Sequence, residues 1–482
     1  MRTLRLRPHL PSGINYARRF PIMDSRNRYG RRRFIQSAGV ASLVTPAFAA
    51  AENTAKMNWP IVETREVDVL VAGGGMTGVF AAIGAKEPDI NVVLIEPHNV
   101  LGGQGTAGGV AGICGDTKRV NAPFAELVAE LEKRNLIAPY NPKHDRRPYD
   151  LESCAFFLQD LVLKREIRPL FHACAVSAAR IEGTMTAVLV SSAGGLIEYH
   201  PKVIIDATGD CFVADYCGLE TMHEGPNQQL PMSLYFTLWD TGSPVTPFLP
   251  PICPTWEGDE DIPMTSIHRF PSGKAEVKMK VIGFDSCNGD SLSGAEIHAR
   301  QQMMSLIYHL QTKGYRGTVY DRYVLASVSR QIGIRGARRI VGEHVLTEDE
   351  VKKVTMFDDC VAVGTYHIDY HWPDRLQRAG TGITTPLEPY PIPFRCFIPK
   401  GMNNLLVPGR GTSSDQMAMS SLRVMATCAQ MGFAAGNAAL LSVRKSCPVR
   451  SIAIAELQKA IVDGGQSLDL SDYGEYLQNT QG

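Results

Sequence analysis

The chain has 482 residues, a formal net charge of zero and 44% hydrophobic residues. Its length predicts two or three domains with ample core, and its composition excludes a disordered chain. The neutral charge balance argues against nucleic acid as a main partner. None of the eleven cysteines stands in a Cys-x-x-Cys pair, so the sequence indicates neither a zinc ribbon nor a disulfide framework.

The first fifty residues have the organisation of an export signal. Residues 1–33 contain ten arginines and one acidic residue, Asp24, which alone would also fit a basic arm that binds nucleic acid. The weakly apolar run 37–48 follows, and it is shorter than the roughly 20 residues that a membrane span needs. It ends in "AFAA", where two alanines make the small-x-small pattern of a cleavage site.

The stretch "RRRFI", residues 31–35, resembles the twin-arginine (Tat) signal. We therefore expect export to the periplasm by the Tat translocase, without a stable membrane span. Met23 is an alternative start, and the mature chain is expected to begin near Ala50. Because the Tat route carries proteins already folded around their cofactors, the signal predicts a cofactor that is loaded in the cytoplasm.

A dinucleotide-binding turn follows. The apolar strand "VDVLVA" leads into "GGGMTG", a small-residue helix comes next, and a second apolar strand ends in Glu96. In this pattern Gly73 permits the tight turn, Gly75 lets a pyrophosphate approach the backbone, and Gly78 lets helix and strand pack closely. The helix N-terminus offers N–H groups to the phosphates, and Glu96 accepts hydrogen bonds from a ribose.

A second Gly-x-Gly-x-x-Gly pattern, "GQGTAG" at 103–108, has no strand before it. It is therefore not a second turn of this kind. The chain has one dinucleotide site and no Cys-x-x-Cys, which argues against a disulfide reductase fed by NADPH.

Four long segments resemble a FAD-dependent oxidoreductase family within the glutathione-reductase-like flavoproteins. They are "EPHNVLGGQGTAGG" (96–109), "KVIIDATGDCFVADYCG" (202–218), "SRQIGIRGARRIVGEHVLTEDEV" (329–351) and "NLLVPGRGTSSDQMAMSSLRVMATCAQMGFAAGNAA" (404–439). The resemblance implies non-covalent FAD as the cofactor. Iron–sulfur clusters, which some relatives carry, are disfavoured by the cysteine spacing.

The turn and the resemblance together predict the cofactor-binding residues. The short strand after a helix over 151–165 is expected to supply an adenine contact, and the helix near the end of the family match is expected to aim its N-terminus at the flavin. The predicted residues are Gly73, Gly75, Met76, Thr77, Gly78, Glu96, Gly102, Gly103, Val176, Ala207, Thr208, Gly209, Asp210, Gly409, Arg410, Arg423, Val424 and Met425.

The expected fold class is α/β. It has a Rossmann-like FAD-binding domain, in which a parallel sheet with helices is joined by a small antiparallel sheet, and an inserted α+β substrate or cap domain. The predicted boundaries are 1–50 for the signal, 65–215 and 395–445 for the two parts of the FAD-binding domain, 216–394 for the insert, and 446–482 for a C-terminal tail. Small residues in the closing helix are expected to pack against the sheet. In the insert, a capping box at 293–296 predicts the start of a helix that runs to about Lys313.

Two clusters in the insert could carry chemistry. Arg335, Arg338 and Arg339 lie close together, and at helical spacing the first and last share a face. They form either a solvated, salt-bridged face or an anion clamp; for the clamp, Arg335 and Arg338 are the candidates.

The second cluster is "TYHIDYHW", 365–372, which alternates as a strand does. On a strand His367, Asp369 and His371 point to one side, which favours acid–base work over a satisfied polar strand. A metal site ranks lower, because no further ligand set accompanies these residues.

The leading functional hypothesis is hydride transfer between a small organic substrate, of CH–OH or CH–CH type, and flavin N5 while a side chain handles the proton. Alternatives are a fumarate-reductase-like reductase of an unsaturated carboxylate, or a flavin electron carrier without its own substrate. The absence of a Trp-x-Trp pattern disfavours a halogenase. A small-molecule substrate and an electron acceptor are the expected partners; the sequence names neither.

Overall fold

The structure is a computed structural model that describes residues 60–141, 146–270, 272–377 and 382–474. All of these residues belong to the compact unit that spans residues 58–482. The export signal, its alternative start and the expected start of the mature chain lie outside the described residues.

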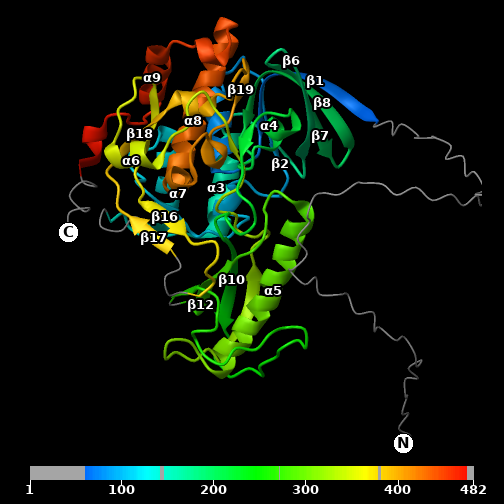
Figure 1. Ribbon diagram of the computed structural model, residues 1–482, viewed down its shortest axis with the longest axis vertical. Helices are drawn as coiled ribbons and strands as arrows, with labels where there is room; N and C mark the ends of the chain where they lie inside the picture. The colour runs from blue at the N-terminus through cyan, green and yellow to red at the C-terminus, as the bar shows by residue number, and fades with distance from the viewer. Residues whose placement is uncertain (1–59, 142–145, 271, 378–381, 475–482) are drawn as a thin grey trace, which may run out of the picture. The chain divides into compact units, whose positions relative to one another are not determined.

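The main sheet has seven strands. Their order is β5-β2-β1-β8-β7-β6, with β19 paired to the C-terminal part of β8. The pairs β2–β5, β1–β2, β1–β8 and β8–β19 are parallel, whereas β8–β7 and β7–β6 are antiparallel. The bounds are β1 Ile61–Ala72, β2 Val92–Glu96, β5 Pro169–Phe171, β6 Cys174–Ile181, β7 Thr184–Ser192, β8 Gly195–Asp206 and β19 Leu405–Leu406. This mixed sheet (Figure 1) confirms the predicted α/β fold class with its Rossmann-like domain.

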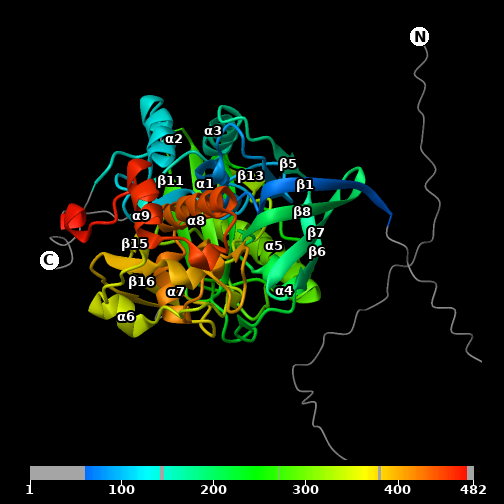
Figure 2. The same cartoon turned by 90° about the horizontal axis from the view of Figure 1, so that it is seen from above.

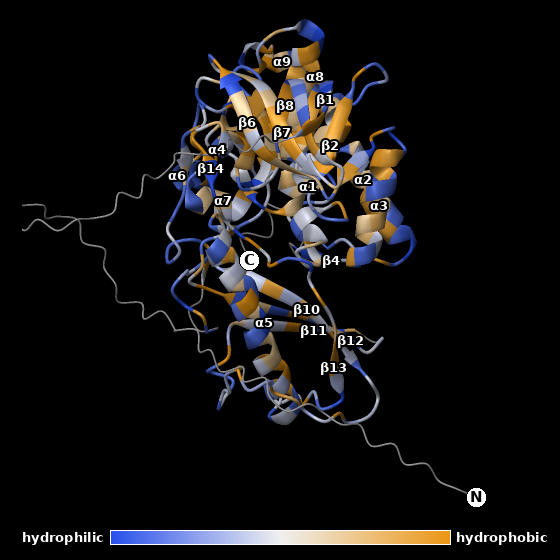
Figure 3. Cartoon of the chain, turned by 90° about the vertical axis from the view of Figure 1, so that its right-hand side faces the viewer, coloured by the Kyte–Doolittle hydropathy of each residue, from blue (hydrophilic) through white to orange (hydrophobic). Residues whose placement is uncertain are grey.

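The central strands form because their sequences are apolar on both faces. Leu70, Val71 and Ala72 at the end of β1 are fully buried, as are Ile204 and Ile205 of β8. A continuous apolar run is what a parallel strand covered on both sides needs. In Figure 3 these strands are mostly orange, the colour of hydrophobic residues.

Helices α1 (Met76–Ala85) and α8 (Met425–Lys445) cross at close range (Figure 2). A Cβ on Gly432 would overlap the carbonyl oxygen of Thr77, and one on Gly436 would overlap that of Ala81. The small residues of α8 therefore serve its contact with α1. The sequence had predicted that these small residues pack against the sheet. In the structure Gly432 and Gly436 face α1 instead.

The insert contains a second, antiparallel sheet in the order β11-β12-β10-β13. Its strands are β10 Met232–Asp240, β11 Thr265–Arg269, β12 Lys274–Val281 and β13 Tyr323–Val328. Apolar residues of β10 and β12 alternate with polar ones and pack with helix α5 (Gly289–Thr312) into a separate core. The other face of β10 and β12 is thereby left polar, as the period of two in a strand requires.

The start of α5 differs from the sequence prediction. Asn288 is the N-cap, and its side chain accepts a hydrogen bond from the Ser291 N–H. The predicted capping box at 293–296 lies inside the helix, where Glu296 accepts a hydrogen bond of 2.7 Å from the Ile332 N–H. A long-range contact thus uses the side chain that the local pattern assigned to a cap.

Further elements surround these layers. The helices are α2 Ala122–Lys133, α3 Leu151–Leu163, α4 Phe212–Tyr216, α6 Glu348–Lys353, α7 Gln416–Leu422 and α9 Ile454–Asp463. The remaining strands are β3 Gly112–Cys114, β4 Arg146–Pro148, β9 Thr221–Met222, β14 Arg339–Ile340, β15 Cys360–Gly364, β16 Ile368–His371, β17 Gly382–Thr385 and β18 Tyr390–Pro393. Within the described ranges no single helix is long and apolar enough to cross a membrane; only the bent pair α7–α8 passes by length and composition. The predicted domain boundaries stay predictions.

Candidate active site

A cavity of about 580 Å³ lies at the carboxyl ends of β1 and β2. The N-terminus of α1, the loop at 102–105, the turn at 207–210 and the start of α8 line it, and the polar face of the second sheet lines it as well. Ligands of open α/β sheets bind at this end of the strands. The cavity therefore joins the predicted dinucleotide turn to the predicted substrate domain.

The glycines of the turn have three separate roles. Gly73 has a φ of +99°, and a Cβ there would lie 2.6 Å from the Ala207 carbonyl oxygen. A Cβ on Gly78 would overlap the carbonyl oxygen of Gly73, so Gly78 serves packing and does not line the cavity. A Cβ on Gly75 would meet only Gly103 Cα, at 3.9 Å, because the space beside it is the cavity.

The N-terminus of α1 can bind an anion. Gly75 is its N-cap and supplies no side-chain acceptor to the first turn. The unpaired N–H groups of that turn suit a phosphate. Met76 and Thr77 line the cavity there, as do Gly102 and Gly103 opposite them.

Glu96 ends β2 and is buried against the cavity. Its two carboxylate oxygens accept hydrogen bonds of 2.8 Å from the N–H groups of Gly74 and His98. Burial raises the pKa of Glu96, and these two hydrogen bonds oppose that rise. Each oxygen retains a lone pair, which suits the hydroxyl groups of a ribose.

Val176, the residue expected to contact adenine, belongs to β6 beside the cavity. Ala173, Cys174 and Ala175 line the cavity, whereas Val176 does not. Val176 is 39% exposed, and the strand register shifts between Ala175 and Ser177. Val176 therefore adjoins the cavity wall without lining it.

The turn after β8 is held by Arg410. Its Nη2 lies 2.6 Å from Asp210 Oδ1, and its Nε donates to the Gly209 carbonyl at 3.0 Å. Thr208, Gly209, Asp210 and Arg410 line the cavity, as does Ala207, whereas Gly409 packs against Thr77 outside it. Burial raises the pKa of Asp210 and the charge of Arg410 opposes that rise.

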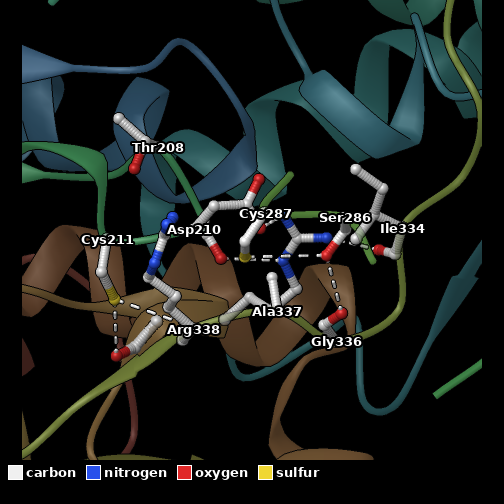
Figure 4. Close-up of polar contacts among 12 residues, drawn as sticks. Thr208, Asp210, Cys211, Ser286, Cys287, Ile334, Gly336, Ala337 and Arg338 are labelled. Carbon is white, nitrogen blue, oxygen red and sulfur yellow. Dashed lines mark hydrogen bonds and ion pairs between the residues drawn. The ribbon is translucent and has the colours of Figure 1, made fainter. Parts of the chain in front are cut away.

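Arg338 lies outside the cavity lining. Its Nη2 lies 3.3 Å from Asp215 Oδ2 and its guanidinium stacks over the Phe212 ring. In Figure 4 Arg338 lies beside Cys211, whose Sγ donates to the Arg338 carbonyl oxygen at 3.5 Å. The Arg338 side chain is 17% exposed and does not line the cavity, so the structure does not bring it there as the sequence hypothesis required.

The other two arginines of that cluster, Arg335 and Arg339, lie in different surroundings. Residues 329–338 form an extended segment in place of the helix considered, so Arg335 and Arg339 do not share a helical face. Arg339 is buried and pairs with Glu224. Arg335 lines the cavity, and its Nη1 donates to the Pro231 carbonyl oxygen at 2.7 Å.

The junction of α7 and α8 supplies Arg423, Val424 and Met425 to the cavity. The two helices are bent by 94° here, and Val424 is the N-cap of α8. The start of α8 therefore lies at the cavity. The Arg423 side chain turns to Asp369: its Nη2 donates to the main-chain oxygen at 2.9 Å and lies 3.4 Å from Oδ2.

The predicted His–Asp–His group is only partly at the cavity. Asp369 lines it, and His371 lies behind, with Nε2 3.2 Å from Asp369 Oδ1. Burial and the charge of Arg335 lower the pKa of His371 to about 3, so its ring is neutral. His367 precedes β16 and stacks on Tyr366, which does line the cavity, while His367 does not. β16 starts only at Ile368, so His367 lies outside the strand and does not share the face of Asp369 and His371 that the alternating pattern predicted.

Asp369 is ionised. Burial by itself would raise its pKa, but the hydrogen bond from His371 and the charges of Arg423 and Arg335 lower the pKa well below its usual range. A carboxylate held in this way is a poor proton acceptor at neutral pH. Its chemical use is to hold Arg423 in place.

The second sheet supplies residues that the sequence hypothesis missed. Tyr235 and Lys278 are direct partners in the β10–β12 register, and both line the cavity. Among the residues that the structure describes, the side chain of Lys278 has neither a hydrogen-bond partner nor an ion-pair partner, whereas its backbone belongs to the sheet. Burial and the charge of Arg335 lower the pKa of Lys278 to about 7. The signal was present in "KAEVKMKV", where three lysines and a glutamate alternate with buried apolar residues.

Within the described part of the chain, one group of metal-ligand type lies in the insert. His223, Asp285 and Cys287 bring ligand atoms within 4.8 Å of one another. Asp285 Oδ1 already lies 3.1 Å from His223 Nε2, and it accepts hydrogen bonds from Gln229 and the Cys287 N–H. These hydrogen bonds account for the arrangement.

The cavity fits FAD by its own chemistry. A glycine cradle open to the cavity, uncapped N–H groups of α1 and a buried carboxylate at the end of β2 suit the pyrophosphate and ribose of a dinucleotide. The two helix N-termini at the cavity, of α1 and α8, favour negative charge. The residues of the turn, Glu96 and the start of α8 would hold the cofactor.

Comparisons with known proteins agree with this fit. Residues 68–461 match the profile of the family described as FAD dependent oxidoreductase. No curated protein matches the chain. Solved structures that resemble it include a geranylgeranyl bacteriochlorophyll reductase-like protein from Thermoplasma acidophilum, with 12% identity, a TM-score of 0.45, and coverage of 86% of this chain and 96% of that one. Another is the p-nitrophenol 4-monooxygenase PnpA from Pseudomonas putida DLL-E4, with 10% identity, a TM-score of 0.41, and coverage of 87% and 94%.

These structural likenesses are too distant to carry a reaction over to this chain. The family match spans most of the chain, including both halves of the cavity. The chain therefore belongs to the family of FAD-dependent oxidoreductases.

Proposed function

We propose that this enzyme transfers a hydride between FAD and a small organic substrate of CH–OH or CH–CH type, at the polar face of the second sheet. The observation that carries the proposal is that one cavity is lined both by the dinucleotide turn and by ionisable side chains of the insert. Bound FAD supplies the hydride acceptor or donor. The chain must then bind the substrate and move its proton.

The proton is assigned to Lys278. Its amine lines the cavity, has no partner among the described residues, and has a pKa of about 7 because burial disfavours its charge. A group that titrates near the working pH transfers protons most effectively. His371 is less suited, since it lies behind Asp369 and its pKa is about 3.

The test starts from the bound flavin, because its colour reports the reaction without a known electron acceptor. Purified enzyme loaded with FAD is mixed without oxygen with alcohols, hydroxy acids and saturated acids. Enzyme reduced by dithionite is mixed with the matching ketones and unsaturated acids. We expect at least one compound to change the flavin absorption; if neither panel does so, the proposal of a hydride substrate is wrong.

Variants then separate the candidate proton-transfer groups. We expect Lys278→Met to keep FAD and to slow the flavin reaction about 10²–10⁴-fold. Lys202→Met is the matched control, since Lys202 is exposed on β8 and pairs with Asp68. If Lys278→Met reacts at the wild-type rate while His367→Gln or His371→Gln reacts slowly, proton transfer is assigned to a histidine instead.

We also propose that the enzyme is exported by the twin-arginine route. The support is the stretch "RRRFI" with the cleavage pattern "AFAA", together with a cofactor that is made in the cytoplasm. The Tat translocase is then a transient partner during export.

A further inference from the structure

We propose that Arg335 and Arg423 form an anion subsite in the cavity, and that the substrate carries a carboxylate that binds there. This inference rests on the proposed hydride transfer for the identity of the ligand as substrate. It deepens that proposal, because it names the class of substrate, which the two sets of test compounds leave open.

Arg423 has hydrogen-bonding capacity that the protein leaves unused. Its side chain is 9% exposed, and its hydrogen bonds, both from Nη2, go to Asp369. Nη1 is buried and has no partner among the described residues. Burial lowers the pKa of Arg423 to about 10, so the side chain remains charged at neutral pH. A buried, charged donor without an acceptor is costly, and such a group is expected to meet a ligand.

Arg335 reaches the same cavity from the extended segment 329–338. Only its Nη1 donates within the described protein, to the Pro231 carbonyl oxygen, so Nε and Nη2 remain available. Its charge acts on Lys278, Asp369 and Arg423, which places all four groups in one electrostatic neighbourhood. Two guanidinium groups that still have free N–H donors suit the two oxygens of a carboxylate.

Three neighbouring arginines each have a carboxylate of their own, although Arg338, like Arg423, has a buried Nη1 without a partner among the described residues. Arg338 pairs with Asp215, Arg339 with Glu224, and Arg410 with Asp210. Arg423 shares its one carboxylate, Asp369, with His371, and Arg335 has an ion pair with no described residue.

The charges on the cavity wall are also unbalanced. Besides the two arginines, Arg146 lines the cavity, and Lys278 adds a charge below its pKa of about 7, whereas the acidic groups on the substrate side are Asp369 and Glu276. Glu276 already pairs with Lys274 at 2.8 Å. An incoming anion would restore the balance in a cavity where unpaired charge is expensive.

The experiment measures anion binding on the oxidised, FAD-loaded enzyme and needs no turnover. Acetate and succinate are titrated at constant ionic strength while the flavin difference spectrum and the heat of binding are recorded. Acetamide and succinamide serve as neutral isosteres, and sulfate serves as an inorganic anion. We expect saturable binding of the carboxylates and little effect of the amides or of sulfate.

Variants assign the binding to the two arginines. Arg335→Gln and Arg423→Gln should each weaken carboxylate binding about 10- to 100-fold, the value of a hydrogen bond to a charged group. Arg338→Gln is the matched control, three residues away and outside the cavity, and should leave the affinity unchanged. Because Arg423→Gln could disturb FAD binding nearby, Arg335→Lys is a second variant; it keeps the charge but loses the planar donors, so it should bind more weakly than the wild type.

The outcomes separate the two proposals. If no carboxylate binds, if sulfate binds equally well, or if Arg335→Gln binds as the wild type does, the subsite is wrong and the excess charge serves reduced FAD instead. If carboxylates bind as expected but no compound of either panel changes the flavin, the subsite stands and the hydride proposal fails.

Discussion

The proton-transfer role proposed for Lys278 implies a cost in the stability of the folded protein. Its side chain lies on the half-buried polar face of β12 that lines the cavity, without a described partner, and the charge of Arg335 acts on it. A charged lysine in such a place destabilises the folded state unless its pKa falls. This loss of stability can be measured by unfolding the protein at different pH values, without knowledge of the substrate.

We expect Lys278→Met to stabilise the FAD-loaded protein at acidic pH. The folded-state pKa of about 7 lies below the ordinary lysine value, so the charged form is disfavoured by folding. At about pH 6 the amine is charged in both the folded and unfolded states, and the whole penalty, about 1–4 kcal/mol, is present. The penalty fades as the pH rises from about 7 to about 10.4, where both states become neutral.

Urea unfolding at the two ends of that pH range measures this gain, with Lys202→Met as control. A gain of the same size at both ends would mean that the methionine stabilises by hydrophobic burial and that the amine carries no ionisation penalty.

The same titration predicts the pH dependence of the reaction. In the direction that oxidises the substrate, Lys278 must be neutral to accept a proton, so the rate of flavin reduction should rise as the pH passes about 7. In the reverse direction the rate should fall over the same range. Stopped-flow reduction across this range checks the sign, and a rise that persists unchanged in Lys278→Met would assign the titration to another group.

Gly75 separates folding from cofactor binding. A Cβ there would meet only Gly103 within 4 Å and would lie at the cavity, so Gly75→Val should fold but lose FAD. Gly78→Val is the contrasting variant, because its side chain would overlap the Gly73 carbonyl and disturb the fold itself. Flavin absorbance and circular dichroism distinguish the two results. A yellow, fully loaded Gly75→Val protein would contradict the assignment of the turn.

At the scale of elements, the crossing of α1 and α8 sets the geometry of the site. The N-terminus of each helix reaches the cavity. The two helices are in direct main-chain contact at Gly432, Gly436 and Gly84. A Cβ on Gly84 would lie 2.6 Å from the Phe433 carbonyl oxygen. The distance between the helices therefore determines how the two ends of the cofactor site are spaced.

Gly432→Ala should destabilise the protein by about 1–3 kcal/mol, since the added methyl overlaps the Thr77 carbonyl and neither backbone can yield without moving a helix. FAD affinity should fall with it, because Thr77 belongs to the α1 end of the cavity. Thermal unfolding with and without FAD measures both effects. Gly194→Ala, in the open turn before β8, is the control and should change little; equal stability of the two variants would argue against a tight crossing.

At the scale of the whole molecule, the FAD site unites distant parts of the chain. The β1–α1–β2 segment, the turn after β8 and the start of α8 all reach one cavity, and the insert closes it from another side. A cofactor bound by all of them stabilises the folded state by its own binding energy. This arrangement is compatible with the proposed export of the folded, FAD-loaded protein.

We expect Arg31→Lys with Arg32→Lys to keep the protein, with FAD bound, in the cytoplasm. The triple variant that includes Arg33→Lys is the fair comparison, because three consecutive arginines leave the register of the motif open. Cell fractionation with flavin fluorescence of each fraction gives the readout. Undiminished arrival of the triple variant in the periplasm would point to another export signal.

The sequence alone determined the features that depend on neighbours along the chain. The turn at 73–78 and the acid that ends β2 could be read directly, because a glycine-rich turn and the strands beside it are encoded in a few adjacent residues. The family resemblance added the turn after β8 and the start of α8. Most of the predicted cofactor residues accordingly line the cavity.

Only the tertiary structure decided which polar groups are already satisfied. Arg335, Arg338 and Arg339 look alike in sequence, yet two of them have carboxylate partners more than a hundred residues away and the third lies at the cavity. Lys278 passed unnoticed in the sequence because its isolation depends on what β10 and β16 bring near it. Local patterns specify conformation, whereas charge pairing and burial depend on contacts between distant segments, and these determine which side chains remain free for chemistry.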